Sequence, residues 1–70
     1  MIQIRSEIPA SVWQVKVMEG DQVEAGDELI ILESMKMEIA VVAPVGGTVR
    51  AVHAKPDDRV QEGDLLAELG

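Results

Sequence analysis

The chain has 70 residues, enough for one small domain, and carries 13 acidic against 6 basic residues for a formal charge of −7. The absence of Cys excludes a disulfide framework and Cys-ligated metal centres, and one His is too few for most metal sites. The negative charge opposes nucleic-acid binding, and the longest uncharged apolar stretch, Ile39 to Gly47, is too short to cross a membrane. We therefore expect a cytoplasmic protein, monomeric in isolation, that binds neither nucleic acid nor a membrane.

The sequence contains an internal repeat with an offset of 37 residues. When residues 8–33 are set against residues 45–70, the following positions are identical: Val12/Val49, Val15/Val52, Asp21/Asp58, Val23/Val60, Gly26/Gly63, Asp27/Asp64, Leu29/Leu66 and Leu32/Leu69. Because turn formers and apolar residues recur in the same order, the chain is predicted to contain two copies of one supersecondary unit. Each copy is too small to bury its own apolar face, so the two should share one core about a pseudo-twofold axis.

In chain order, strands are expected at residues 11–18, 29–32, 39–42 and 48–54, separated by turns rich in Gly, Asp and Pro. The first and last of these segments are equivalent strands of the two halves. Trp13 aligns with Arg50 in the repeat, so we expect it to be partly exposed and to cover a sheet edge. Short strands with regular turn signals predict an all-β sandwich or barrel.

Residues 28–43 break this rhythm, because they contain no Gly, Pro, Asn or Asp. As one strand they would span about 53 Å, roughly twice the diameter of about 28 Å expected for a domain of this size. The strand must therefore turn back, and an even split places the reversal at Met35-Lys36. A helix would be only about 24 Å long and would fit, but apolar residues surround its every face and many are β-branched, which favours the hairpin.

The expected hairpin tip, Ser34 to Met37, contains none of the residues favoured in a tight hairpin turn. Such an override of local preference indicates a functional site. An amine at an apex between two exposed thioethers suits acylation of Lys36 by an enzyme that grips the methionines. Glu33 and Glu38 flank the tip, and we assign them at most recognition by that enzyme or its partners. Neither desolvation nor a neighbouring cation is available to make Lys36 a catalyst itself.

The segment Glu33-Ser34-Met35-Lys36-Met37-Glu38 resembles the biotin-attachment motif of the biotinyl/lipoyl domain family, in which a Lys between two Met residues is biotinylated. The resemblance covers essentially the whole chain, since residues 8–13 are similar to the family's opening strand and residues 43–64 to its second half. It implies one biotinyl domain over residues 1–70, a flattened β-barrel or barrel-sandwich hybrid of two antiparallel four-stranded sheets. The hairpin apex would lie at one end and both termini at the other. No room exists for a thumb insertion before Gly20, so the chain is similar to a thumbless carrier.

By this resemblance a biotin ligase attaches biotin covalently to Lys36, recognising Met35 and Met37, with Glu33, Ser34 and Glu38 as hairpin flanks. The biotin is carboxylated by a biotin carboxylase subunit and carries CO₂ to a carboxyltransferase, in acetyl-CoA carboxylase or a related system. The domain would be a non-catalytic carrier and not an enzyme. The initial Met followed at once by a strand favours a free-standing chain.

Two alternatives stay open. In lipoyl domains the Lys is usually preceded by Asp and followed by Ala, so Met35 and Met37 favour biotin. A thumbless single domain could nevertheless accept lipoate, as a carrier in a dehydrogenase or glycine-cleavage system. The other alternative is an unmodified interaction module with the same fold, which would require Lys36 to be buried.

Overall fold

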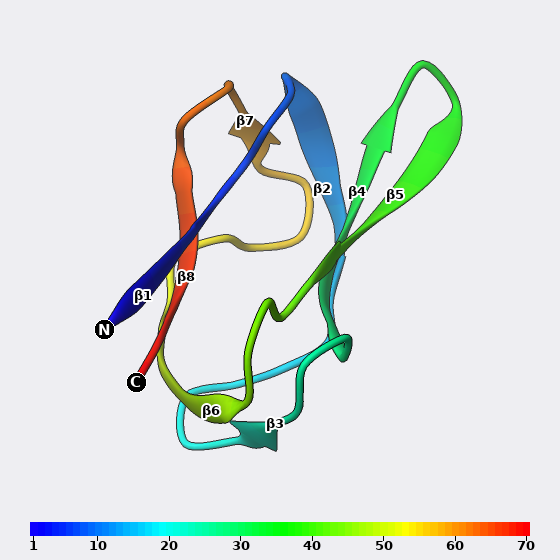
Figure 1. Ribbon diagram of the computed structural model, residues 1–70. Coiled ribbons are helices and arrows are strands. Elements are labelled where there is room, and N and C mark those ends of the chain that lie inside the picture. Colours follow the sequence, from blue (N-terminus) through cyan, green and yellow to red (C-terminus); the bar gives the residue numbers. More distant parts are fainter.

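Segments rich in Val, Ile and Leu form eight strands in the computed structural model, which describes residues 1–70. The strands are β1 (Ile2–Arg5), β2 (Ala10–Val15), β3 (Gln22–Val23), β4 (Glu28–Ser34), β5 (Met37–Val42), β6 (Gly47–Val52), β7 (Arg59–Val60) and β8 (Leu65–Leu69). They build two four-stranded sheets, in the orders β1-β8-β6-β3 and β5-β4-β2-β7, with antiparallel pairing throughout (Figure 1). The predicted all-β fold with two antiparallel four-stranded sheets is confirmed.

The two halves of the chain have the same turns. In each of four turns, an Asp carboxylate accepts a hydrogen bond from the backbone N–H three residues earlier, which is why Asp recurs in the repeat. These bonds, 2.8–3.0 Å long, join Met18 to Asp21, Glu24 to Asp27, Lys55 to Asp58 and Gln61 to Asp64. The last two bonds reproduce the first two after a shift of 37 residues. The pseudo-twofold relation predicted from the repeat therefore holds at the level of single hydrogen bonds.

The two long equivalent strands end earlier than the sequence predicted. The first is Ala10–Val15 instead of 11–18, and the second is Gly47–Val52 instead of 48–54. After Val15, the Lys16 N–H still donates to the Leu29 carbonyl at 2.9 Å, but the Met18 N–H donates to the Asp21 carboxylate. The chain thus leaves the sheet to enter the turn, although Val17 and Met18 are apolar residues of the kind found in strands.

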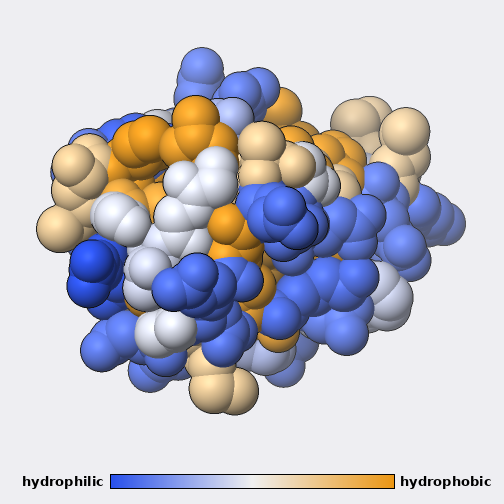
Figure 2. Space-filling view, turned by 60° about the horizontal axis from the view of Figure 1, so that its bottom comes forward, coloured by the Kyte–Doolittle hydropathy of each residue, from blue (hydrophilic) through white to orange (hydrophobic).

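One hydrophobic core lies between the sheets and receives side chains from both halves. Its largest fully buried members are Val12, Leu29, Ile30, Leu32, Val49, Leu66 and Leu69. A domain this small cannot bury all of its apolar residues, and Figure 2 shows hydrophobic side chains interrupting a mainly hydrophilic surface. A helix long and hydrophobic enough to span a membrane is absent from the structure.

The β4–β5 hairpin and the two chain termini lie at opposite ends of the molecule (Figure 1). The domain is elongated, with extents of 30 × 17 × 17 Å, and the hairpin turn lies at one end of it. The termini occupy the place that is equivalent to the hairpin turn, because β1 pairs with β8 in one sheet as β5 pairs with β4 in the other. Both features match the expected arrangement.

Candidate functional site

The β4–β5 hairpin reverses at the two residues that the length argument predicted. Ser34 pairs with Met37 at the ends of the strands, leaving Met35 and Lys36 as a two-residue turn. A turn this short fixes the register and holds the tip rigidly on the sheet, since β4 continues downward into the buried centre of the domain. Lys36 is therefore the apex of a well-anchored projection.

Both turn residues adopt a left-handed backbone conformation. The φ angle is 53° at Met35 and 65° at Lys36, and positive φ at both central positions is the mark of a type I′ hairpin turn. Such turns normally use Asn-Gly, because a left-handed residue with a side chain costs about 1–2 kcal/mol. The fold accepts this strain at two successive positions. Local folding preference did not select these two residues.

The side chains of the tip face solvent. Met35 is 91% exposed and Met37 is 65% exposed, so neither methionine contributes to the core. Lys36 is exposed and takes part in neither of the structure's two ion pairs. By contrast, Lys16 is held by Glu28 at 2.7 Å. The interaction-module alternative required a buried Lys36, and the lysine is accessible.

The acidic residues beside the tip form a cross-strand pair. Glu33 and Glu38 stand directly opposite each other on β4 and β5, one step inside Ser34 and Met37. Like charges at directly opposed positions disfavour strand pairing, so these two carboxylates weaken the hairpin slightly instead of supporting it. Ser34 is half-buried at the end of β4. The structure thus brings together all six residues that the sequence singled out.

Replacing the turn with its preferred residues, Met35→Asn together with Lys36→Gly, is expected to stabilise the domain. Asn and Gly adopt positive φ at little cost, so relief of about 1–2 kcal/mol at each position, less about 0.5–1 kcal/mol for the extra entropy that Gly loses on folding, should raise the free energy of unfolding by about 1–3 kcal/mol. For a domain of this size the melting temperature should rise by roughly 5–20 °C. Differential scanning calorimetry measures the change. As the control, Lys55→Gly replaces a lysine whose φ is not positive and should lower stability.

Two surface features near the hairpin were not foreseen. Trp13 is 52% exposed, as predicted, and it lies on β2 beyond the two residues, Ala10 and Ser11, that pair with β7. It lines a shallow hollow of about 230 Å³ on the sheet surface, whose walls are three apolar residues, Trp13, Ile31 and Ala40, and four polar ones, Gln14, Lys16, Glu28 and Glu38. The sequence does contain a sign of apolar side chains on the outer face of this sheet. Residues 29–32 are four consecutive apolar residues, and successive side chains of a regular strand point to opposite faces.

The second unforeseen feature is a groove of about 460 Å³ where the sheets do not pair with each other. It runs between β1 and β5, the outermost strands on that side, and is lined mainly by apolar residues such as Ile8, Ile39 and Pro44. Sequence alternation gives no sign of it, because a groove between two sheet edges depends on how the sheets are stacked. No group of His, Cys, Asp and Glu suited to a metal ion is present.

Residues 3–69 match the profile of a protein family described as a biotin-requiring enzyme. The chain belongs to the biotin/lipoyl attachment family. The match includes both copies of the repeat and the whole β4–β5 hairpin. Members of this family carry biotin, and lipoate is the family's other attached group.

Relatives within the biotin/lipoyl attachment family include chains of nearly the same length. A biotinylated protein TB7.3 homolog of Mycobacterium leprae is 55% identical over 66 residues, which cover 94% of this chain and 93% of that one. A biotin/lipoyl attachment protein of Bacillus subtilis is 51% identical over 63 residues, covering 90% and 86% respectively. The urea carboxylase structure of Kluyveromyces lactis matches with a TM-score of 0.92 and 39% identity, over 99% of this chain and 6% of that enzyme.

Proposed function

We propose that this protein is a biotin carboxyl carrier in which biotin is attached to Lys36. The observation that carries the proposal is the Met35-Lys36-Met37 apex, where a free, exposed amine stands between two exposed thioethers on a strained turn. Biotin attachment fits this site, since Lys36 lies in the β4–β5 turn at one end of the domain and is exposed, so that an enzyme can reach it without moving a covering segment. Similarity to a biotinylated protein and to part of a carboxylase supports the same assignment.

Attachment requires an activating enzyme, because nothing near Lys36 can activate a carboxyl group. In the proposed step a biotin ligase presents an activated biotin, and the Lys36 Nζ lone pair attacks its carbonyl carbon. An amide bond forms, the activating group leaves and the nitrogen loses a proton. Met35 and Met37 provide flexible, polarizable contacts for the ligase on both sides of the amine.

After attachment, this chain's task is to carry and present the group. Bound biotin supplies a nitrogen that accepts and releases CO₂, and the protein's residues hold the arm at the end of a rigid hairpin. The domain serves in turn a biotin carboxylase and a carboxyltransferase, as separate partners. It is a carrier substrate of both and catalyses neither reaction. The whole chain, residues 1–70, acts as the carrier domain in the cytoplasm.

Intact mass spectrometry of the chain after incubation with biotin ligase, biotin and ATP tests the proposal. A gain of one biotinyl group, mapped by peptide analysis to Lys36, is expected. A chain that stays unmodified under conditions that biotinylate a known acceptor refutes the proposed function.

Lipoate is a second candidate group, because a relative with 51% identity is described as a biotin/lipoyl attachment protein. The double substitution Met35→Asp with Met37→Ala should shift modification from biotin towards lipoate, since it removes both thioether contacts and places a carboxylate beside the amine. The measurement is the ratio of the two adducts when biotin ligase and lipoate ligase compete for the chain. A ratio equal to that of the wild type would show that the flanking residues do not set the choice.

A further inference from the structure

The groove between β1 and β5 is mainly apolar. These two strands are outer edges of their sheets, and the groove between them has a volume of about 460 Å³. Seven of its eleven lining residues are hydrophobic, and Pro44 adds an eighth apolar side chain. The remaining three, Gln3, Arg5 and Glu7, are polar and exposed. A concave site of this volume, with an apolar lining and a few polar groups, is typical of a small-molecule site.

One end of the groove lies on the side of the β4–β5 turn. In Figure 1 the connection from β1 to β2, which contains Ile8, is at the same end of the molecule as that turn. Ile39, which pairs with Leu32, comes three residues after Lys36. At the rise of a strand this distance along β5 is about 10 Å. The arm of a biotinylated lysine measures about 14 Å from the Cα to the ring at ordinary bond lengths, so it is long enough to reach the groove.

An apolar path leads from the hairpin tip into the groove. Successive side chains of a strand point to opposite faces, so Met37, Ile39 and Val41 share one face of β5. Ile39 and Val41 line the groove and pack partly against the core, whereas Met37 is 65% exposed. An arm that bends along this face therefore meets apolar side chains from the tip to the groove.

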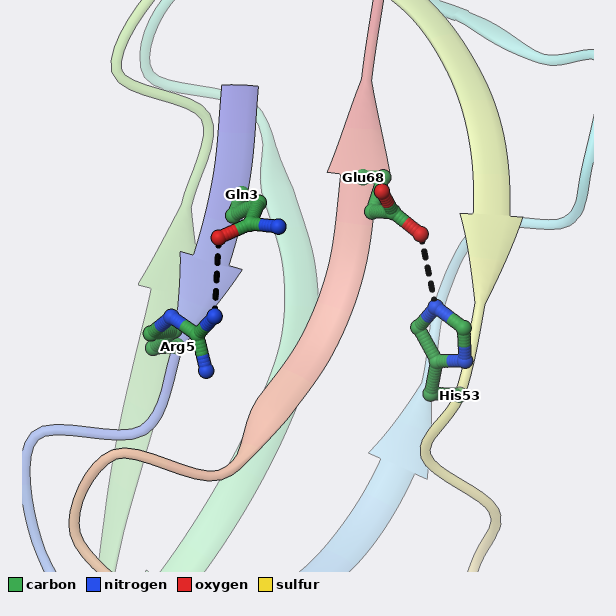
Figure 3. A network of polar contacts seen from close by, with 4 residues as sticks. All are labelled: Gln3, Arg5, His53 and Glu68. Atoms are coloured by element: carbon green, nitrogen blue, oxygen red, sulfur yellow. Dashed lines mark hydrogen bonds and ion pairs between the residues drawn. The ribbon is translucent and has the colours of Figure 1, made fainter. Parts of the chain in front are cut away.

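The polar residues of the groove match the hydrogen-bonding groups of a cyclic urea. Figure 3 shows Arg5 beside Gln3 on β1, and the guanidinium donates at 2.8 Å to the Gln3 side-chain oxygen and to the Gly63 carbonyl. Both acceptors are neutral, and a guanidinium has further N–H donors for a ligand. Neither Arg5 nor Glu7 forms an ion pair within the chain. The urea of biotin has a carbonyl that can accept from Arg5 and N–H groups that can donate to Glu7.

We infer that the groove between β1 and β5 is a docking site for the ring of this carrier's own biotin, an inference that rests on the proposed function. The apolar lining suits the thioether ring and the acyl chain, and Arg5 and Glu7 suit the urea. Because the group is attached to the same chain, its effective concentration at the groove is about 1 mM. A Kd as weak as about 0.1 mM then keeps roughly nine-tenths of the biotin docked.

Docking gives the carrier a resting state in which the biotin lies against its own domain. The apolar lining shields part of the ring from water, and the arm no longer extends from the hairpin tip. A partner enzyme binds only the undocked ring, so its site must hold the ring more tightly than the groove does. The groove thereby sets how much of the biotin is free between encounters.

Nuclear magnetic resonance of the wild-type chain, before and after biotinylation, tests the inference directly. The ring protons of biotin should give nuclear Overhauser effects to the methyl groups of Ile8 and Ile39, and the signals of these methyl groups should shift. Val15 and Val52 are the controls, because they also pack, partly buried, against the core but do not line the groove. Their methyl signals should stay in place.

Capture of the biotinylated chain by streptavidin provides a second readout, because streptavidin binds only a ring that has left the groove. Arg5→Gln removes the charged donor, which should weaken docking about tenfold and speed capture about fivefold. Arg50→Gln is the matched control, since it removes the same charge from an exposed residue of β6 outside the groove. Its capture rate should stay within about 1.5-fold of the wild type. Melting temperatures verify that both variants are folded.

Ring protons without contacts to Ile8 and Ile39, together with equal capture rates for the wild type and a folded Arg5→Gln, overturn the inference. Groove signals that shift with protein concentration before biotinylation also overturn it and assign the groove to a second copy. A chain that takes no biotin refutes the proposed function, whereas a biotinylated chain with an undocked ring refutes this inference alone.

Discussion

Replacing Lys36 by Arg is expected to abolish biotinylation completely while leaving the fold unchanged. A guanidinium cannot form the amide under the conditions in which a ligase acylates an amine, because it stays protonated. Lys36 makes no hydrogen bond or ion pair through its side chain, so the free energy of unfolding should change by no more than about 0.5 kcal/mol. Intact mass after exposure to ligase, biotin and ATP measures the first effect, and thermal unfolding measures the second.

The other two lysines provide the control for this substitution. Lys16→Arg and Lys55→Arg should each be biotinylated like the wild type, because neither residue lies at a hairpin tip between methionines. An adduct that persists in Lys36→Arg would remove Lys36 from the site. A loss of stability well above 0.5 kcal/mol would contradict the position of Lys36 as an exposed apex.

The hairpin and the symmetry could be predicted because each follows from a long-range constraint. Residues 28–43 are too long for one strand of a small domain, and the midpoint of the segment is where the chain turns. The repeat offset placed Asp21 and Asp58 in equivalent turns, and the same hydrogen bonds form there. Neither inference needed the exact end of any strand.

Strand ends and the β-bulge at Trp13 could not be predicted, because they depend on single residues. Val17 and Met18 are apolar and suit a strand, but the backbone N–H of Met18 donates to Asp21 in the turn. At Trp13 the β-bulge inserts an extra residue into β2, and alternation cannot reveal where an extra residue falls. The two-residue strands β3 and β7 are too short for any periodicity to indicate.

The tip shows how strain and function are connected in this fold. Asn-Gly would satisfy the turn at lower energy, and like charges would not be opposed at Glu33 and Glu38 if pairing alone were selected. Both departures occur within the six residues around the proposed attachment site. The strained turn keeps Lys36 exposed on a rigid tip, and the free energy that the strain and the opposed charges cost is offset by packing in the rest of the domain.

Truncation of Leu66 to Ala is expected to destabilise the whole domain, including the half that contains the hairpin. Leu66 and its repeat partner Leu29 are both 0% exposed in the shared core. Each Leu→Ala change should therefore cost about 2–5 kcal/mol, out of a total of about 4–10 kcal/mol for a chain of this length. Met18→Ala, at a side chain that is 70% exposed, should change stability by less than about 0.5 kcal/mol.

The single Trp makes this prediction decisive, because it lies in the half opposite Leu66. Urea unfolding followed by Trp13 fluorescence reports on β2, and circular dichroism reports on all strands. If the halves share one core, Leu66→Ala lowers both midpoints equally and the two transitions coincide. A fluorescence midpoint that stays at the wild-type value would mean that the halves unfold independently. If both midpoints fall together, the β4–β5 hairpin that carries Lys36 depends for its stability on core side chains, such as Leu66, from the other half of the chain.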